Sequence, residues 1–236
     1  MSKKVAKIDI SEASKKKLAD AVSNALSNAE SGYNAQNLMG FRNGLGVFNL
    51  NHIFKELVKT SDENLVVVYF KRGAFQSVFV YDVPSGTLIT LTSTANMTRL
   101  RKRKEVPSAH YIDALLSINV GYEGDRRQTC MFPNDPDWQT ERESLCNTLL
   151  LAVREREVQK YIVCEYDIKH KTFSLYSLRC SLYSANYIKL CDISLADYLK
   201  PNYEVAAGSE VESVTEQKEP IAKLGIKLKN KKADNA

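Results

Sequence analysis

The sequence lacks any apolar run approaching the roughly 18 consecutive residues that a membrane-spanning helix needs. It also lacks a signal peptide, because the lysine-rich opening MSKKVAKIDISEASKKK is followed by no apolar segment. These two absences argue against a membrane-bound or exported chain. They predict a cytoplasmic protein that does not bind a membrane.

Closely spaced cysteines are also absent. The five cysteines lie far apart, form no C-x-x-C pair and have no histidine pair beside them. Disulfide frameworks and structural zinc sites need closer or paired ligands. We therefore expect free, buried thiols in a reducing compartment, and no bound metal or cofactor.

Signatures of well-known enzymes are missing too. The sequence contains no phosphate-binding P-loop, no dinucleotide-binding fingerprint and no G-x-S-x-G nucleophile elbow. Its 44% hydrophobic and 26% charged residues are nevertheless typical of a folded protein with a sizeable core. The sequence favours a folded protein that is not an enzyme.

Two blocks of alternating apolar residues predict two groups of strands. Both faces of the first block are apolar, so its sheet must be covered on both sides, by helices or by a partner chain. The predicted strands are 65–71, 75–83 and 87–93 in the first block, and 161–167, 172–179 and 187–191 in the second.

Helical periodicity surrounds and separates these blocks. The first helix, over 11–27 with Asp9 or Ser11 as its cap, has a thin alanine-rich face and is expected to pack lightly. Further helices are predicted to start at Asn49, with Phe48 and Ile53 forming a hydrophobic staple, at Asn96, at Ser108, and at a capping box formed by Thr140 and Glu143.

Together these elements predict an α+β fold with a largely antiparallel sheet of about six strands flanked by helices. Residues 1–62 are expected to form a helical segment packed on the core, and residues 63–202 the core domain. Residues 203–236 change to a composition rich in Glu, Lys, Ser and Gly, which predicts a disordered charged tail.

One internal similarity links the two strand blocks. Residues 81–88 and 166–173 both read Tyr-Asp-aliphatic, three turn residues, then Thr followed by an apolar residue. Two hairpins can converge on this pattern because Asp bonds the turn backbone and Thr suits the strand. The alternative is a duplicated unit. We expect Asp82 and Asp167 to end their strands.

The best catalytic candidates are acidic. Asp137, in Pro-Asp-Trp, and the later Asp167 and Lys169 resemble the PD…(D/E)xK nucleases, where two carboxylates hold a divalent metal and a lysine steadies water. However, Asp137 precedes a predicted helix and the other two flank a turn, where Asp and Lys are common. His110, one helical turn before Asp113, is a further candidate because the carboxylate could tune its ring.

A basic run forms the first candidate binding site. Five cations in a short helix could neutralise several phosphates, although no aromatic residue for base stacking lies on either side. A solvent-exposed helix is the alternative. The candidate residues are Arg99, Arg101, Lys102, Arg103 and Lys104.

The long loop over 121–139 forms the second candidate binding site. Loops of this length are usually functional or disordered, and its aromatic and arginine residues are of the types that dominate protein interfaces. The alternative is that its aromatics fill the core. The candidate residues are Tyr122, Arg126, Arg127, Phe132 and Trp138.

The segments KRGAFQSVFVYD, HYIDALLSIN, YIVCEYD and SLADYL resemble a group of uncharacterised bacterial and phage-borne proteins, over about residues 65–199. The resemblance implies two strand blocks flanking a helical middle. It also implies a mobile-element setting, in which toxin–antitoxin partners, defence components and their inhibitors are common. No catalytic residue carries over from it.

The sequence as a whole favours a non-enzymatic protein-binding or regulatory protein, acting in phage–host conflict through a protein partner or a second copy of itself. The alternative is a nucleic-acid-binding protein using residues 99–104, or a metal-dependent nuclease or toxin.

Overall fold

The two predicted strand blocks join into one six-stranded sheet whose strands lie in chain order. The computed structural model describes residues 5–35, 44–72, 75–102, 110–122, 136–153, 156–169 and 173–199. Each block is an antiparallel meander. The first contains β1 (Leu65–Arg72), β2 (Phe75–Asp82) and β3 (Thr87–Ser93), and the second contains β4 (Lys160–Lys169), β5 (Ser174–Tyr183) and β6 (Lys189–Ser194).

The meanders meet at a parallel pair. β3 and β4 run in the same direction, in register from Thr87 beside Lys160 to Ser93 beside Tyr166. A parallel pair needs a long crossover connection, which the helical middle of the chain provides. The sheet is therefore mixed but mostly antiparallel, and the predicted α+β fold is confirmed. The crossover contains α3 (Thr94–Arg101), α4 (Tyr111–Leu116), the short 3₁₀ helix η1 (Ser117–Asn119), α5 (Pro136–Leu150) and the 3₁₀ helix η2 (Leu151–Val153).

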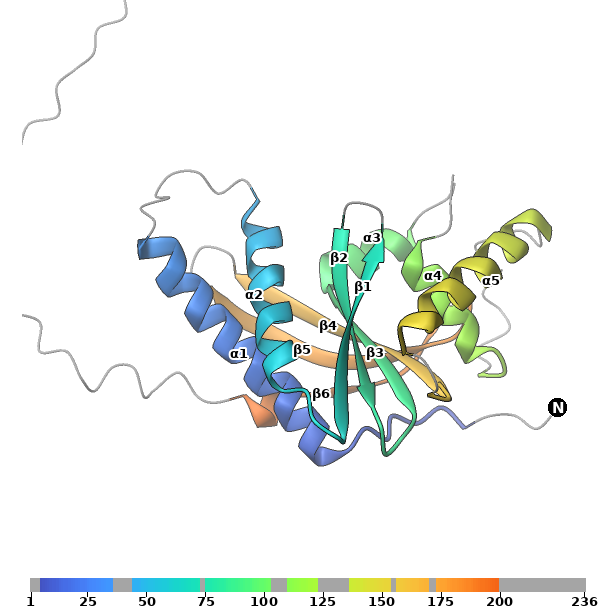
Figure 1. Cartoon of the computed structure of the whole chain (residues 1–236), viewed down its shortest axis with the longest axis horizontal. Helices are drawn as coiled ribbons and strands as arrows, with labels where there is room; N and C mark the ends of the chain where they lie inside the picture. Colours follow the sequence, from blue (N-terminus) through green and yellow to red (C-terminus); the bar gives the residue numbers. More distant parts are fainter. Residues whose placement is uncertain are drawn as a thin grey trace, which may run out of the picture. The chain divides into compact units, whose positions relative to one another are not determined.

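Helices cover both faces of the sheet, as its apolar faces require. α1 (Glu12–Ala35) and α2 (Leu45–Lys59) lie against one face, and α3, α4 and α5 lie on the other (Figure 1). Each face has its own apolar core, with buried side chains from both the sheet and its helices.

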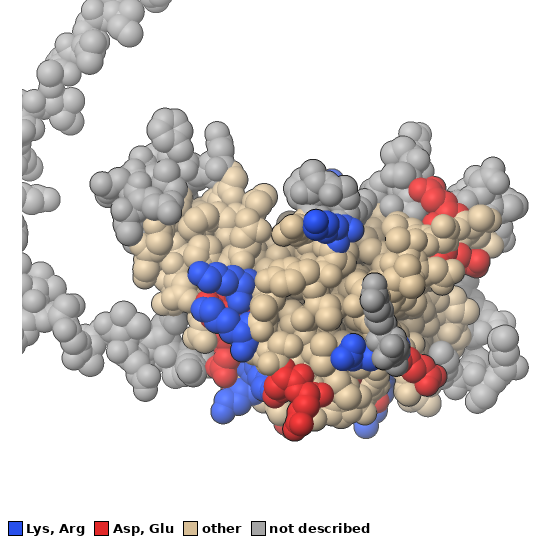
Figure 2. All heavy atoms as spheres, in the orientation of Figure 1, with Lys and Arg blue, Asp and Glu red and all other residues tan. Residues whose placement is uncertain are grey.

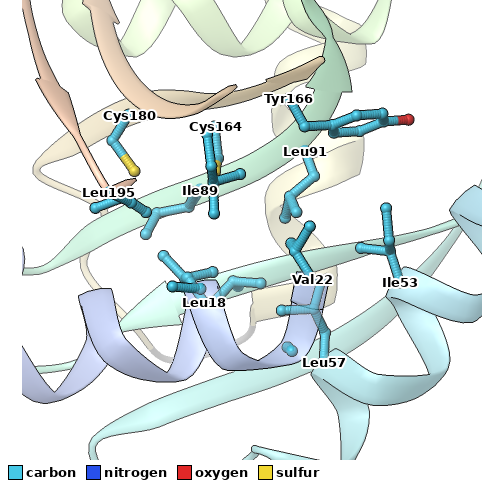
Figure 3. Close-up of a cluster of buried hydrophobic side chains, with 14 of the residues drawn as sticks. Leu18, Val22, Ile53, Leu57, Ile89, Leu91, Cys164, Tyr166, Cys180 and Leu195 are labelled. Carbon is cyan, nitrogen blue, oxygen red and sulfur yellow. The ribbon is translucent and has the colours of Figure 1, made fainter. Parts of the chain in front are cut away.

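The first helix packs more deeply than its composition suggested. Leu18, Val22 and Ala25 of α1 are completely buried in the core beneath the sheet. Figure 3 shows Leu18 and Val22 below Leu91 of β3. The prediction of light packing is wrong because small alanine side chains let the helix backbone approach the sheet closely.

Several helix starts also differ from the predictions. α2 begins at Leu45 after Gly44, whose positive φ of 85° suits glycine, so Phe48 lies inside the helix rather than forming a staple with Ile53. Ser93, not Asn96, caps α3, because its hydroxyl accepts a hydrogen bond from Asn96 N at 3.1 Å. α5 begins at Pro136, a favoured first position, so the expected capping box lies within the helix.

The similar hairpins have different environments. Asp82 ends β2 and is completely buried, as the strand-ending prediction requires. Asp167 is exposed within β4, which continues to Lys169 after a register shift between Asp167 and Ile168, so that prediction is wrong. Moreover, β2–β3 closes the first meander whereas β4–β5 opens the second. The shared Asp thus takes a different position in each of the two hairpins.

The described residues, between 5 and 199, belong to one compact unit. The helices of residues 1–62 supply one side of the core of this unit. The predicted tail, 203–236, lies outside the described residues. Among the helices that are described, none is both long and apolar enough to span a bilayer.

Candidate functional site

The first candidate site is the open edge of β1. Among the described residues, this strand pairs with β2 on one side only, and it begins the sheet. Val83 N donates to Asn64 O at 2.9 Å, and this bond determines which residues of β1 direct their N–H and C=O groups toward β2. Even-numbered residues of β1 therefore bond β2, while the N–H and C=O groups of odd-numbered residues point away from the sheet.

The start of this edge is satisfied within the chain. Leu65 N donates to Asp62 Oδ1 at 2.8 Å, and Val67 N donates to Ser61 Oγ at 3.0 Å. Through these bonds, the loop before β1 covers the edge as far as Val67. The outward backbone groups of Tyr69 and Lys71 thus lie on the part of the edge that another strand could reach.

The side chains along β1 are also unprotected. Sheet edges are usually guarded by charges, prolines or bulges. Residues 65–70 read LVVVYF, with no charge and no proline, and their register with β2 is unbroken. Tyr69 is 60% exposed, and Leu151 of the neighbouring η2 is 67% exposed. Figure 2 shows a mostly uncharged area over this strand, with charged side chains at its borders.

The opposite edge provides a comparison within the same sheet. β6 has six residues, two of them charged, and its pairing with β5 shifts register between Leu182 and Tyr183. Asp192 Oδ2 forms an ion pair with Arg179 Nη1 at 3.1 Å. β6 thus combines charge with a register shift, whereas the two charged residues of β1, Lys71 and Arg72, lie together at its end and its register is unbroken.

The second candidate site is the basic end of α3. Arg99, Arg101 and Lys102 are exposed there, while Arg103 and Lys104 lie outside the described residues. The Arg101 guanidinium lies 5.8 Å from the ring centroid of Tyr183 in β5, and Lys189 Nζ of β6 lies 5.7 Å from the same centroid. Two cations from distant segments therefore converge on one ring.

A buried carboxylate lies beside these cations. Tyr183 donates a hydrogen bond to Glu165 Oε1 at 2.7 Å, and Lys189 Nζ lies 3.4 Å from the same oxygen. Burial, with this hydrogen bond, raises the pKa of Tyr183 and keeps its hydroxyl protonated. Glu165 therefore offsets one of the nearby positive charges. Sequence reasoning missed Glu165, Tyr183 and Lys189, because only the fold brings them beside α3.

The structure does not assemble the nuclease-like candidates into a site. Asp167 and Lys169 are exposed near the end of β4, and Asp137 falls in the first turn of α5, where its side chain lies outside the described residues. Within the described ranges, no three His, Cys, Asp or Glu side chains are grouped to hold a metal ion.

His110 is part of a helix cap. Its Nδ1 accepts a hydrogen bond from Ile112 N at 3.3 Å, and its backbone N donates to Asp113 Oδ2 at 2.7 Å. Asp113 also accepts a hydrogen bond from the Tyr187 hydroxyl. These bonds form a capping box that fixes the start of α4.

The long loop is described only at its ends. Tyr122 is buried and packs into the core on the α1 face, which matches the core-filling alternative for that residue. Arg126, Arg127 and Phe132 lie outside the described residues, as does the side chain of Trp138 in α5.

A polar cavity of about 500 Å³ lies where β4 begins. Lys160 lines it and is nearly buried, and its Nζ donates to Lys7 O at 2.8 Å and to Asp9 Oδ1 at 2.6 Å. The lysine thereby fastens the N-terminal segment to the sheet. Its remaining lining residues are Asp9, Ser85, Ile118, Tyr122, Glu157, Val158 and Gln159.

Comparison with known proteins places the whole of this architecture in one family. No curated protein and no solved structure matches the chain significantly. The model of a family of unknown function, DUF5986, matches residues 7–236, which extends the resemblance seen over 65–199 in both directions. The chain belongs to this family, the family of unknown function DUF5986.

Proposed function

We propose that this protein acts by binding another protein chain, which adds a β-strand to the edge of β1. The observation that carries the proposal is the unguarded edge LVVVYF, whose outward backbone groups at Tyr69 and Lys71 lie beyond the bonds from Ser61 and Asp62. In strand addition, main-chain hydrogen bonds supply affinity and alternate side chains supply specificity.

The surroundings of β1 fit such an interface. Exposed Tyr69 and Leu151 offer the aromatic and apolar contacts that interface centres favour. Lys71 marks the end of the uncharged stretch. A role in phage–host conflict is a prediction from the sequence resemblance, and it would make the bound chain a host, phage or antitoxin protein.

A proline at position 69 tests this proposal. Tyr69→Pro removes an outward N–H that β2 does not use, so an edge strand should tolerate it while strand addition is blocked. Tyr69→Thr is the matched control, because it shortens the side chain but keeps the N–H and suits a strand. We expect proteins recovered with the wild type to be retained by Tyr69→Thr and lost by Tyr69→Pro.

Amide hydrogen exchange gives the second measurement. Adding the purified partner should slow exchange at Tyr69 and Lys71 in the wild-type protein. Recovery of the same partner by Tyr69→Pro, or binding without protection at these two amides, would contradict strand addition.

A second candidate function, nucleic-acid binding, is favoured by the convergence of Arg101 and Lys189 on Tyr183. Together with Arg99 and Lys102 these cations extend the basic surface of α3 onto β6. Replacing Arg99, Arg101 and Lys102 by alanine should weaken binding of a labelled oligonucleotide and lower its salt dependence, by about one unit of slope for each phosphate that the variant no longer neutralises.

The control for this measurement is the pair Lys55→Ala and Lys59→Ala, which removes exposed cations from α2 on the other face of the sheet. Binding that is weak and insensitive to salt, or equally affected by both sets of substitutions, would argue against the basic surface.

A further inference from the structure

We infer that the strand accepted by β1 is β1 of a second copy of this chain, antiparallel to the first, with Tyr69 of each copy opposite Tyr69 of the other. This inference rests on the proposed function and specifies its partner. The resulting dimer would have one continuous sheet of two joined six-stranded halves.

The free backbone groups of β1 are complementary to themselves. About a two-fold axis at Tyr69, the N–H and C=O of Tyr69 meet the same groups of the second copy. Lys71 N of each copy then donates to Val67 O of the other copy. Val67 N donates to Ser61 Oγ at 3.0 Å in the single chain, so this hydroxyl must give way to the Lys71 carbonyl of the second copy when the strands pair.

The side chains agree with the same register. On the face covered by α3 to α5, Val68 lies opposite Phe70 of the second copy, an aliphatic–aromatic pair of the kind that stabilises sheets. On the other face the two exposed Tyr69 rings become neighbours. Next along the face covered by α3 to α5, Val66 lies opposite Arg72 of the second copy, at the border of the apolar pairs.

Charge excludes the neighbouring register centred on Lys71. Lys71 is the first charged residue after the apolar stretch, and it is exposed. With the axis at Tyr69, each Lys71 lies opposite Val67. Moving the axis to Lys71 would place the two lysines directly opposite each other, which is unfavourable. The two copies need no oppositely charged surfaces to associate, because the mostly uncharged area over β1 of one copy faces the same area of the other (Figure 2).

A charge swap at position 69 tests the inference, because the axis sets this residue against itself. We expect the wild type to be a dimer by light scattering during size exclusion. Tyr69→Lys and Tyr69→Glu should each weaken dimerisation at least about tenfold, since like charges then face each other. An equimolar mixture of the two variants should recover the dimer.

The control is Tyr176→Lys, which adds the same charge in place of another exposed tyrosine, 71% exposed on the interior strand β5. This variant should dimerise like the wild type. Position 69 is exposed and lies outside both cores, so we expect every variant to fold. Circular dichroism of each variant checks this.

Three results would overturn the inference. These are a wild type that stays monomeric from micromolar to millimolar concentration, a dimer that tolerates both charges, and a mixture that fails to recover. If the wild type is monomeric but Tyr69→Pro still loses a partner that Tyr69→Thr keeps, strand addition stands and only the second copy is excluded. If neither effect is seen, both proposals fail.

Discussion

The Ser14 hydroxyl donates a hydrogen bond to the buried carboxylate of Asp82 at 2.5 Å, which joins the first turn of α1 to the last residue of β2. Ser11 Oγ donates to the same oxygen at 3.1 Å, and Ser85 N donates to the other oxygen at 3.2 Å. The carboxylate also lies at the N-terminus of α1, where the helix dipole favours negative charge.

Replacing Asp82 should therefore destabilise the fold. Asp82→Ala leaves the buried Ser14 hydroxyl and the part-buried donors of Ser11 and Ser85 without their acceptor, and we expect the free energy of unfolding to fall by about 3 kcal/mol. Urea denaturation followed by circular dichroism measures this change. The matched control is Asp167→Ala in the similar hairpin, where the exposed side chain should change stability by less than about 0.5 kcal/mol.

The side chain of Asn119 should be equally important. It is completely buried at the end of η1, and its Nδ2 donates to Tyr161 O at 2.7 Å and to Tyr183 O at 2.8 Å. Its Oδ1 accepts from Tyr161 N at 2.9 Å. Asn119→Ala leaves these strand groups unpaired and should lower the free energy of unfolding by about 3 kcal/mol. The exposed Asn186→Ala should have little effect, and equal losses would contradict this role.

Stability should decrease at alkaline pH because of Tyr166. Burial raises the pKa of this phenol to about 12 in the folded protein. Between pH 10 and about 12 the unfolded chain releases the proton while the folded chain retains it, so rising pH favours unfolding. Tyr166→Phe should remove about 1.4 kcal/mol of the loss between pH 9 and pH 11. Urea denaturation at these two pH values measures it, and an unchanged pH dependence in Tyr166→Phe would contradict it.

Removing the amine of Lys160 should loosen the N-terminal segment. Lys160→Met keeps the apolar stem of the side chain but removes the bonds to Lys7 O and Asp9 Oδ1. We expect faster amide hydrogen exchange over residues 5–11, with a loss of global stability of only about 1 kcal/mol, because Asp9 is half-exposed and can be hydrated. Lys169→Met, exposed on the same strand, is the control. Unchanged exchange over 5–11 would show that other contacts hold the segment.

The strands could be predicted from the sequence because their information is local. Alternating apolar residues and the turn at Pro84 and Gly86 place β2 and β3 within a residue of their observed ends. Helix starts were harder, since the sequence offers several caps close together. Ser93 was overlooked because it also ends β3, where it reads as part of the strand.

The candidate sites depend on information that no local pattern contains. The apolar character of LVVVYF was visible, but the order of the strands, which makes β1 an edge, is a property of the whole sheet. In the same way, Arg101 was a visible cation, whereas its meeting with Lys189 over Tyr183 requires α3 to pack near the second meander.

The parallel pairing of β3 with β4 also sets an order of events during synthesis. β4 emerges from the ribosome long after β3, because the entire helical middle is made between them. Until then β3 is itself an edge strand, and Leu88 and Ile89, completely buried in the finished fold, lack their partners Tyr161 and Ile162 in β4. The growing chain thus has two apolar edges open at once, at β1 and β3, and its yield in the cell should depend on chaperones that shield them.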